Sequence, residues 1–231
     1  MSILNRIRFR LRLWARSHYV VTARNVMRII GLKRVKMTYY ERDLSIYIPP
    51  TQANMTVKVA VPSASDIKNK CYKGVVLASG DDPVTHNETL SRLKSGEILF
   101  VARVENSVAG LMWVSVGGAR YESFLEVEDS FAPDEAWGYD AVVFSKFRRN
   151  RISEKMLEES VDCLRLRNIS KIGLSIETDN DRATMSVTAV GFYPIKNVTC
   201  TRLFKLKRVK VCEITQSQRK VCPKTGVRVT G

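Results

Sequence analysis

Apolar and polar residues alternate in several segments between residues 55 and 145, and the alternation predicts a series of strands. A period of two places successive side chains on opposite faces of a sheet. The polar residues Glu105, Asn106 and Ser107 separate two strongly apolar segments, which predicts a β-hairpin at this point. Five segments are expected as strands: residues 55–62, 97–106, 107–118, 120–128 and 135–145.

After residue 150 the helical period appears. Residues 152–167 carry a stripe formed by Ile152, Met156, Val161 and Leu164, which is typical of an amphipathic helix. The other expected elements are strands at 171–180 and 199–211, a helix at 181–190, a helix that begins at Ser63 or Ser65, and a helix at 86–93. This order predicts an α/β fold with a mixed, mostly antiparallel central sheet and one β-α-β crossover.

Pro49 and Pro50, followed by polar residues, predict a domain boundary near residue 50. We therefore expect residues 1–50 to form a basic N-terminal arm or extension. Residues 51–212 are expected to form the domain, and residues 213–231 a basic C-terminal tail.

The charge of the chain favours an anionic partner. It has 38 Lys and Arg against 23 Asp and Glu, a net charge of +15, and residues 1–36 carry ten of the bases and no acid. The arm suits a peripheral membrane surface or a nucleic acid. Alternatively, the surplus is a solvated basic surface, and the arm packs on its own domain or on the second subunit of a homodimer.

Several classes of protein are excluded by composition. The five cysteines are scattered without a C-x-x-C pair, and His18 and His86 are the only histidines, so we expect neither a disulfide framework nor a metal site. There is no run of eighteen apolar residues and no apolar secretory segment. The expected location is the cytoplasm, with membrane association through the arm as an alternative.

Three stretches resemble the GNAT superfamily of acyl-CoA N-acyltransferases. The first is YDAVVFSKFRRNRISEKML, in which Arg148, Arg151 and Ser153 match a pyrophosphate-binding turn of the form R/Q-x-x-G-x-G/A. The second is SIETDNDRATMSVTAVGF, with an Asn, a small residue and Gly-Phe in the usual order. The third is the hairpin ILFVARVENSVAGLMWVSV. The resemblance covers residues 55–210 and implies that residues 51–212 are a GNAT-like acyltransferase domain.

The resemblance also implies a set of site residues. Acetyl-CoA or another acyl-CoA would bind, without a metal, along the central strand and the following turn. The implied cofactor-binding residues are Val142, Val143, Phe144, Arg148, Arg149, Asn150, Arg151, Ile152, Ser153 and Asn180. Asp140 is the first candidate for the catalytic base, followed by Glu122 and Glu126. The alternative for each carboxylate is a solvated or ion-paired group at a strand end.

Two positions depart from the family pattern. Arg151 stands where the family has glycine, so its side chain either crowds the pyrophosphate or swings out and pairs with it. Val187 stands where the family often has a tyrosine that protonates the leaving thiolate.

The resemblance implies transfer of an acyl group, expected to be acetyl, from acyl-CoA to the amine of a small molecule such as an amino sugar or amino acid derivative. One alternative keeps the chemistry but takes a long acyl chain from an acidic acyl carrier protein. Another is a non-catalytic GNAT-like module that binds nucleic acid or an anionic membrane.

Overall fold

The computed structural model describes residues 32–63, 66, 77–79, 82–84, 86–204 and 206–215. Most of the expected arm, the helix expected after Ser63 or Ser65 and most of the C-terminal tail lie outside these residues. In the part of the chain that the structure describes, no helix is long and apolar enough to cross a membrane.

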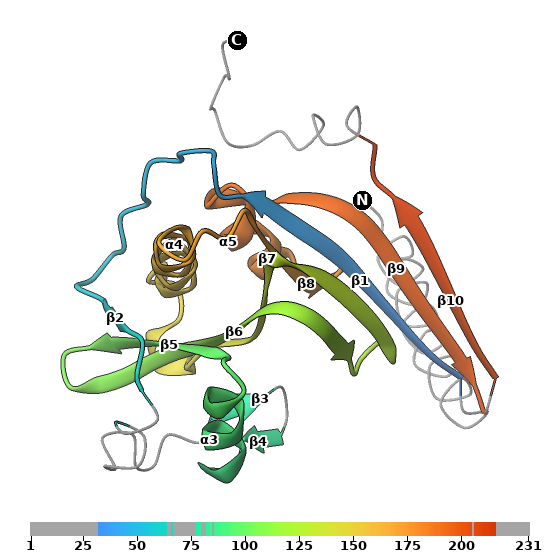
Figure 1. Cartoon of the computed structure of the whole chain (residues 1–231), viewed down its shortest axis with the longest axis horizontal. Coiled ribbons are helices and arrows are strands. Elements are labelled where there is room, and N and C mark those ends of the chain that lie inside the picture. Colours follow the sequence, from blue (N-terminus) through green and yellow to red (C-terminus); the bar gives the residue numbers. More distant parts are fainter. Residues whose placement is uncertain are drawn as a thin grey trace, which may run out of the picture.

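One eight-stranded sheet forms the centre of the molecule, with the strand order β10-β9-β1-β8-β7-β6-β5-β2 (Figure 1). Every pairing is antiparallel except that of β7 with β8. The strands are β1 (Leu32–Asp43), β2 (Lys58–Ala60), β5 (Ile98–Val104), β6 (Ser107–Glu122), β7 (Val127–Val143), β8 (Lys171–Glu177), β9 (Tyr193–Leu203) and β10 (Leu206–Glu213). A separate hairpin consists of β3 (Leu77–Ser79) and β4 (Asp82–Val84). The predicted fold class is confirmed.

The helices lie where the helical period predicts them. They are α3 (His86–Lys94), α4 (Ile152–Arg165) and α5 (Asp181–Ala189), with a short 3-10 turn, η1 (Ser145–Phe147), before α4. Helix α4 joins the parallel strands β7 and β8, and it is the predicted β-α-β crossover.

Strand β1 lies inside the sheet, between β8 and β9 (Figure 1). It pairs with β8 from Met37 to Asp43 and with β9 from Leu32 to Glu41. Residues 32–43 precede the boundary expected near residue 50, so the sheet is built from chain on both sides of that boundary.

Two strand predictions are wrong because turns without glycine interrupt the apolar alternation. Residues 199–211 form two strands, β9 and β10, joined at Phe204, which has a φ of 52°. Residues 120–128 are the end of the β6–β7 hairpin rather than a separate strand, with Glu126 at a φ of 54° in its turn. Such turns leave little trace in the sequence, since few non-glycine residues adopt positive φ.

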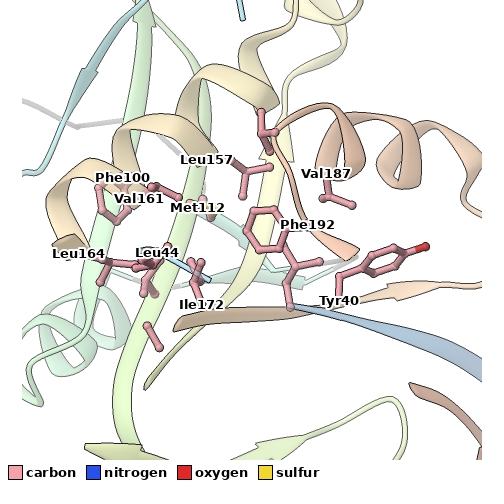
Figure 2. Packing of buried hydrophobic residues seen from close by; sticks show 14 of the residues in the cluster. Tyr40, Leu44, Phe100, Met112, Leu157, Val161, Leu164, Ile172, Val187 and Phe192 are labelled. Atoms are coloured by element: carbon pink, nitrogen blue, oxygen red, sulfur yellow. The ribbon is translucent and has the colours of Figure 1, made fainter. Parts of the chain in front are cut away.

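Helices α4 and α5 cover one side of the sheet, which we call the helix face (Figure 1). Figure 2 shows the core beneath them: Leu157 and Val161 of α4 and Val187 of α5 pack with Phe192 over the sheet. Tyr40, Phe100, Met112 and Ile172 complete this layer from four different strands. Alternate side chains of the strands therefore supply the floor of the helix-face core.

The opposite side, which we call the hairpin face, is covered by α3 and by the end of the β6–β7 hairpin. Gly117 and Gly118 have φ values of 60° and 77°, where glycine is favoured, and the pairing register shifts at this point. Beyond it, Leu125 packs against Met37, Tyr39 and Trp137 on the sheet. The hairpin end is thereby folded back over β1 and β7.

The segment between β1 and β2 is bonded to α4. The Glu158 carboxylate accepts hydrogen bonds from the backbone N–H of Thr51 (2.5 Å) and from its hydroxyl (2.7 Å). At the C-terminal end of α4, Arg165 donates to the carbonyl oxygens of Leu44 (2.6 Å) and Ile46 (2.7 Å). These contacts hold residues 44–54 beside the helix.

The folded-back hairpin predicts that the adjacent residues Leu125 and Phe124 contribute very differently to the stability of the fold. Leu125 is 0% exposed and Phe124 is 50% exposed. We expect Leu125→Ala to lower the free energy of unfolding by about 2–5 kcal/mol, because it leaves a cavity. The matched control Phe124→Ala should change it by less than about 0.5 kcal/mol. Urea denaturation of both variants is the measurement, and equal effects would contradict this packing.

Candidate functional site

Strands β7 and β8 part in the middle of the sheet. Their parallel pairing covers Glu135–Gly138 and Lys171–Leu174 and ends there. Beyond this point β8 continues along β1 as far as Glu177, while β7 continues along β6 as far as Val143. The backbone of β7 from Tyr139 to Val143 therefore has no strand partner on its β8 side among the described residues.

A β-bulge lies directly after the point of parting. On β6, Leu111 pairs with Val142 and Trp113 pairs with Tyr139, so Asp140 and Ala141 together face Met112. Asp140 has a φ of 46°, a conformation that Asp tolerates better than most residues. A bulge redirects the side chains and backbone groups that follow it.

The turn before α4 has the backbone of a glycine turn. Arg149 and Arg151 have φ values of 68° and 57°, and Arg151, the residue that matches the family's glycine, is the N-cap of α4. No side chain caps this end of the helix. Helix α4 therefore presents uncapped N–H groups, which together with the helix dipole favour an anion.

The side chains of the turn point away from the end of the helix. Arg151 donates to the carbonyl oxygen of Gln52 (3.4 Å), and Arg148 donates from Nε to the carbonyl oxygen of Val143 (3.0 Å). Asn150 donates from Nδ2 to the carbonyl oxygen of Phe147 (3.2 Å). The Arg151 side chain therefore contacts the segment between β1 and β2, and its relation to a bound pyrophosphate stays a prediction.

Some of the other expected cofactor-binding residues have structural roles. The backbone N–H of Phe144 donates to the carbonyl oxygen of Ala109 (2.9 Å), so this N–H is already used within the sheet. Asn180 caps α5 by accepting from the backbone N–H of Ala183 (3.2 Å). Ile152 is buried beneath α4, and the Ser153 hydroxyl lies 3.2 Å from that of Ser186 on α5.

Charged and aromatic side chains gather on the hairpin face beside the bulge. We call Arg92, Glu97, Arg120, Tyr139 and Asp140 the bulge cluster. Arg92 of α3 forms ion pairs with Asp140 (2.8 Å) and with Glu88 (2.7 Å). The guanidinium groups of Arg92 and Arg120 lie 5.3 and 3.3 Å from the centre of the Tyr139 ring.

Glu97 is the acid of this cluster that sequence reasoning missed. It lies just before β5, and its carboxylate accepts a hydrogen bond from the Tyr139 hydroxyl. Burial raises the pKa of Glu97 above its usual value, although the charges of Arg92 and Arg120 oppose the shift. No motif marks Glu97, because its partners come from β6, β7 and α3.

The three predicted bases have different surroundings. Asp140 is in the cluster and is ion-paired with Arg92. Glu122 lies near it, close enough to influence Arg120, and accepts from the Ser175 hydroxyl (3.1 Å) on β8. Glu126 instead pairs with Arg202 (2.7 Å) on β9 and accepts through its carbonyl oxygen from Lys207. Glu126 therefore ties down the hairpin end rather than joining the cluster.

No group of three or more His, Cys, Asp or Glu residues suited to a metal occurs in the described part of the chain.

The comparison with known proteins identifies the fold. The sequence matches no protein-family model, and no curated protein is similar to it. A GCN5-related N-acetyltransferase from Sphaerobacter thermophilus superposes with a TM-score of 0.52 at 16% identity, over 84% of this chain and 56% of the other. A GNAT-family protein from Novosphingobium aromaticivorans superposes with a TM-score of 0.50 at 12% identity, over 74% of this chain and 66% of the other.

The chain therefore has the fold of the GNAT acyl-CoA N-acyltransferases. It spans less than two thirds of the length of either of these two structures. At these identities the likeness concerns the fold, and the chemistry has to be argued from the residues of this chain.

Because Arg151 has a positive φ, we expect glycine at this position to be better tolerated than alanine. We expect Arg151→Gly to be more stable than Arg151→Ala by about 1 kcal/mol, because only glycine adopts this φ without strain. Both variants lose the contact with Gln52, so the difference in their stabilities measures only the strain of the positive φ at this position. The control pair Lys155→Gly and Lys155→Ala, inside α4, should show the opposite order. The measurement is the free energy of unfolding in urea, and the same order at both positions would contradict the assigned backbone.

The raised pKa of Glu97 predicts a stability that depends on pH. The folded pKa lies above the unfolded one, so proton release costs stability as the pH rises through the folded value. Glu97→Gln imitates the protonated form and still accepts from Tyr139. We expect it to be more stable than the wild type at pH 7–8 and not at pH 4, measured by thermal unfolding. If the stability difference between Glu97→Gln and the wild type is the same at pH 8 as at pH 4, the raised pKa of Glu97 is contradicted.

Proposed function

We propose that this protein is an N-acyltransferase that transfers an acyl group, expected to be acetyl, from acyl-CoA to the amine of a small molecule. The observation that carries the proposal is the turn before α4. Its backbone has the left-handed conformation at Arg149 and Arg151, it leads into an uncapped helix N-terminus, and it follows the part of β7 that has no β8 partner.

The residues of the turn fit the phosphates of CoA. The N–H groups of the first turn of α4 provide donors and the positive end of the helix dipole. Arg148, Arg149 and Arg151 are exposed and add positive charge within a few residues. Guanidinium groups form strong bonds with phosphate oxygens, and those of Arg148 and Arg151 are now bonded to carbonyl oxygens, which are weaker partners. CoA supplies the acyl group as a thioester.

The bulge cluster fits the acceptor amine. An amine attacks a thioester only after it has lost its proton, and a base serves best when its pKa approaches the working pH. Glu97 has a raised pKa and is bonded to the Tyr139 hydroxyl. In the proposed mechanism the Tyr139 oxygen accepts the amine proton while its own proton passes to Glu97. Asp140 holds Arg92 in place and contributes negative charge that attracts the ammonium form.

The leaving thiolate needs no dedicated acid. Val187 is buried in the helix-face core, so the position of the family's tyrosine supplies no proton. A thiol has a pKa of about 8.5, and its thiolate is therefore stable enough near neutral pH to leave and take a proton from water.

A second candidate donor is an acyl chain carried by an acidic carrier protein. Exposed bases lie across β1, β9 and β10: Arg34 and Lys36 on β1 flank Thr201 and Thr199, and Arg208 and Lys210 flank the same residues from β10. These four bases form no ion pair within the described residues. A surface of this kind attracts an acidic protein.

Ligand-induced stabilisation tests the donor. We expect CoA and acetyl-CoA to raise the midpoint of thermal unfolding, by about 2.7 kcal/mol of stability at a ligand concentration of 100 Kd. Arg148→Ala and Arg151→Ala should weaken this effect. Arg167→Ala removes the same charge beyond the other end of α4 and should not.

The outcomes separate the candidate donors. One outcome is that CoA and acetyl-CoA fail to stabilise the protein while an acyl carrier protein binds to it. If the double variant Arg208→Ala and Lys210→Ala weakens that binding, the carrier protein is the donor. If neither binds, the acyltransferase proposal fails. Salt-sensitive binding of nucleic acid or of anionic vesicles would then support the non-catalytic alternative.

A further inference from the structure

Three buried polar atoms of β6 have no hydrogen-bond partner within the described residues. They are Nε1 of Trp113, Oγ of Ser115 and Nε of Arg120. The Trp113 side chain is fully buried. Buried polar groups in folded proteins are nearly always bonded, so a set that is not bonded indicates that a ligand or water completes it.

The three groups lie in the same part of the molecule. Trp113 and Ser115 are two residues apart on β6, and their partners on β7 are Tyr139 and Trp137. The bend at Gly117 and Gly118 turns the chain back, so that the Arg120 guanidinium lies 3.3 Å from the centre of the Tyr139 ring. Tyr139 is thus in contact with Arg120 and directly opposite Trp113. Arg120 thus belongs to the bulge cluster, Trp113 pairs with a member of it, and Ser115 lies two residues further along the same face of β6.

Arg120 differs from its neighbour Arg92 in having no anion bound to it. Arg92 is bonded to two carboxylates, and these bonds raise its pKa despite burial. Arg120 forms no ion pair and no hydrogen bond with the described residues, and burial lowers its pKa. The half-buried Arg120 guanidinium is therefore held by its contact with the Tyr139 ring and by nearby charges, while its buried Nε lacks a hydrogen bond within the described residues. An anionic ligand would supply that bond.

We propose that Arg120, Trp113 and Ser115 form a carboxylate-binding subsite, and that the acceptor of the reaction is therefore an amine that also carries a carboxylate. The inference rests on the proposed acyltransferase function. The three groups are the donors that a carboxylate requires: a guanidinium, an indole N–H and a hydroxyl. Trp113 and Arg120 lie next to Tyr139, so a carboxylate bound by them would be close to the group that receives the amine proton.

The neighbouring charges favour a carboxylate over a phosphate. Asp140, Glu122 and Glu97 are near enough to act on Arg120. A phosphate carries up to two negative charges and would be repelled by them, whereas a carboxylate carries one. The same acids attract the ammonium group at the other end of the acceptor. The arrangement suits a zwitterion, such as a free amino acid or an amino-uronic acid.

Matched acceptors test the subsite. The probes are free amino acids and 2-amino-2-deoxyhexuronic acids, each compared with its primary amide, which keeps the amine and loses the negative charge. Thiol release from acetyl-CoA gives kcat/KM for each. We expect the acids to exceed their amides by about 10- to 100-fold, the range for a hydrogen-bonded charge whose partner is removed.

Three variants assign the preference to these residues. Arg120→Met, Trp113→Phe and Ser115→Ala each remove one donor while keeping most of the side-chain volume. Arg120→Met should abolish the preference for acids, because kcat/KM falls far more for the acids than for their amides, and the other two variants should reduce the preference. The control Arg182→Met removes an exposed arginine of α5 and should leave the preference intact.

The outcomes distinguish the subsite from the proposed function. Stabilisation by CoA is measured in every variant, and its retention shows that the fold and the donor site are intact. If CoA binds and amides are acylated as well as acids, the subsite is wrong and the acyltransferase function stands. If the wild type shows a preference for acids that Arg120→Met retains, the subsite lies elsewhere. If CoA and acetyl-CoA fail to bind the wild type, the proposed function fails first.

Discussion

The pairing of β8 with β1 is the constraint on which the rest of the site depends. Strand β8 bonds to β1 along all seven of its residues but to β7 along only four. Because β8 stays paired with β1 beyond Leu174, the edge of β7 after Gly138 has no strand partner on that side among the described residues. The bulge at Asp140 and the turn before α4 both follow that edge. A strand taken from the N-terminal part of the chain thus shapes the site from the far side of β8.

The helices were predictable because their signals are local. The apolar stripe of α4 lies within one element, and Gly191-Phe192 follows directly after the C-cap of α5. The position of β1 was not predictable, since a strand's neighbours are chosen by long-range pairing that leaves no spacing in the sequence. The β9–β10 turn was missed for a different reason: Phe204 takes a positive φ that its identity does not suggest.

The two sides of the candidate site also differ in how far they could be predicted from the sequence. The turn before α4 was found from its residues, and Arg151 carries the backbone conformation of the glycine that it replaces. The acceptor side was found only in part. Asp140 was a candidate from its place on β7, but Glu97 is the residue before β5 and Arg120 comes from β6. Arg120 is brought there by the bend at Gly117 and Gly118, a pair whose sequence indicates a bend but not its direction.

The folded-back hairpin end makes one segment serve both the core and the site. Its centre is held by the apolar contacts of Leu125, whereas its rim is held by Glu126 to Arg202 and Asp129 to Lys196. Dissolved salt weakens exposed ion pairs and leaves apolar burial intact or strengthens it. The attachment of the hairpin end to the sheet therefore combines two ion pairs, which dissolved salt weakens, with the apolar packing of Leu125, which it does not weaken.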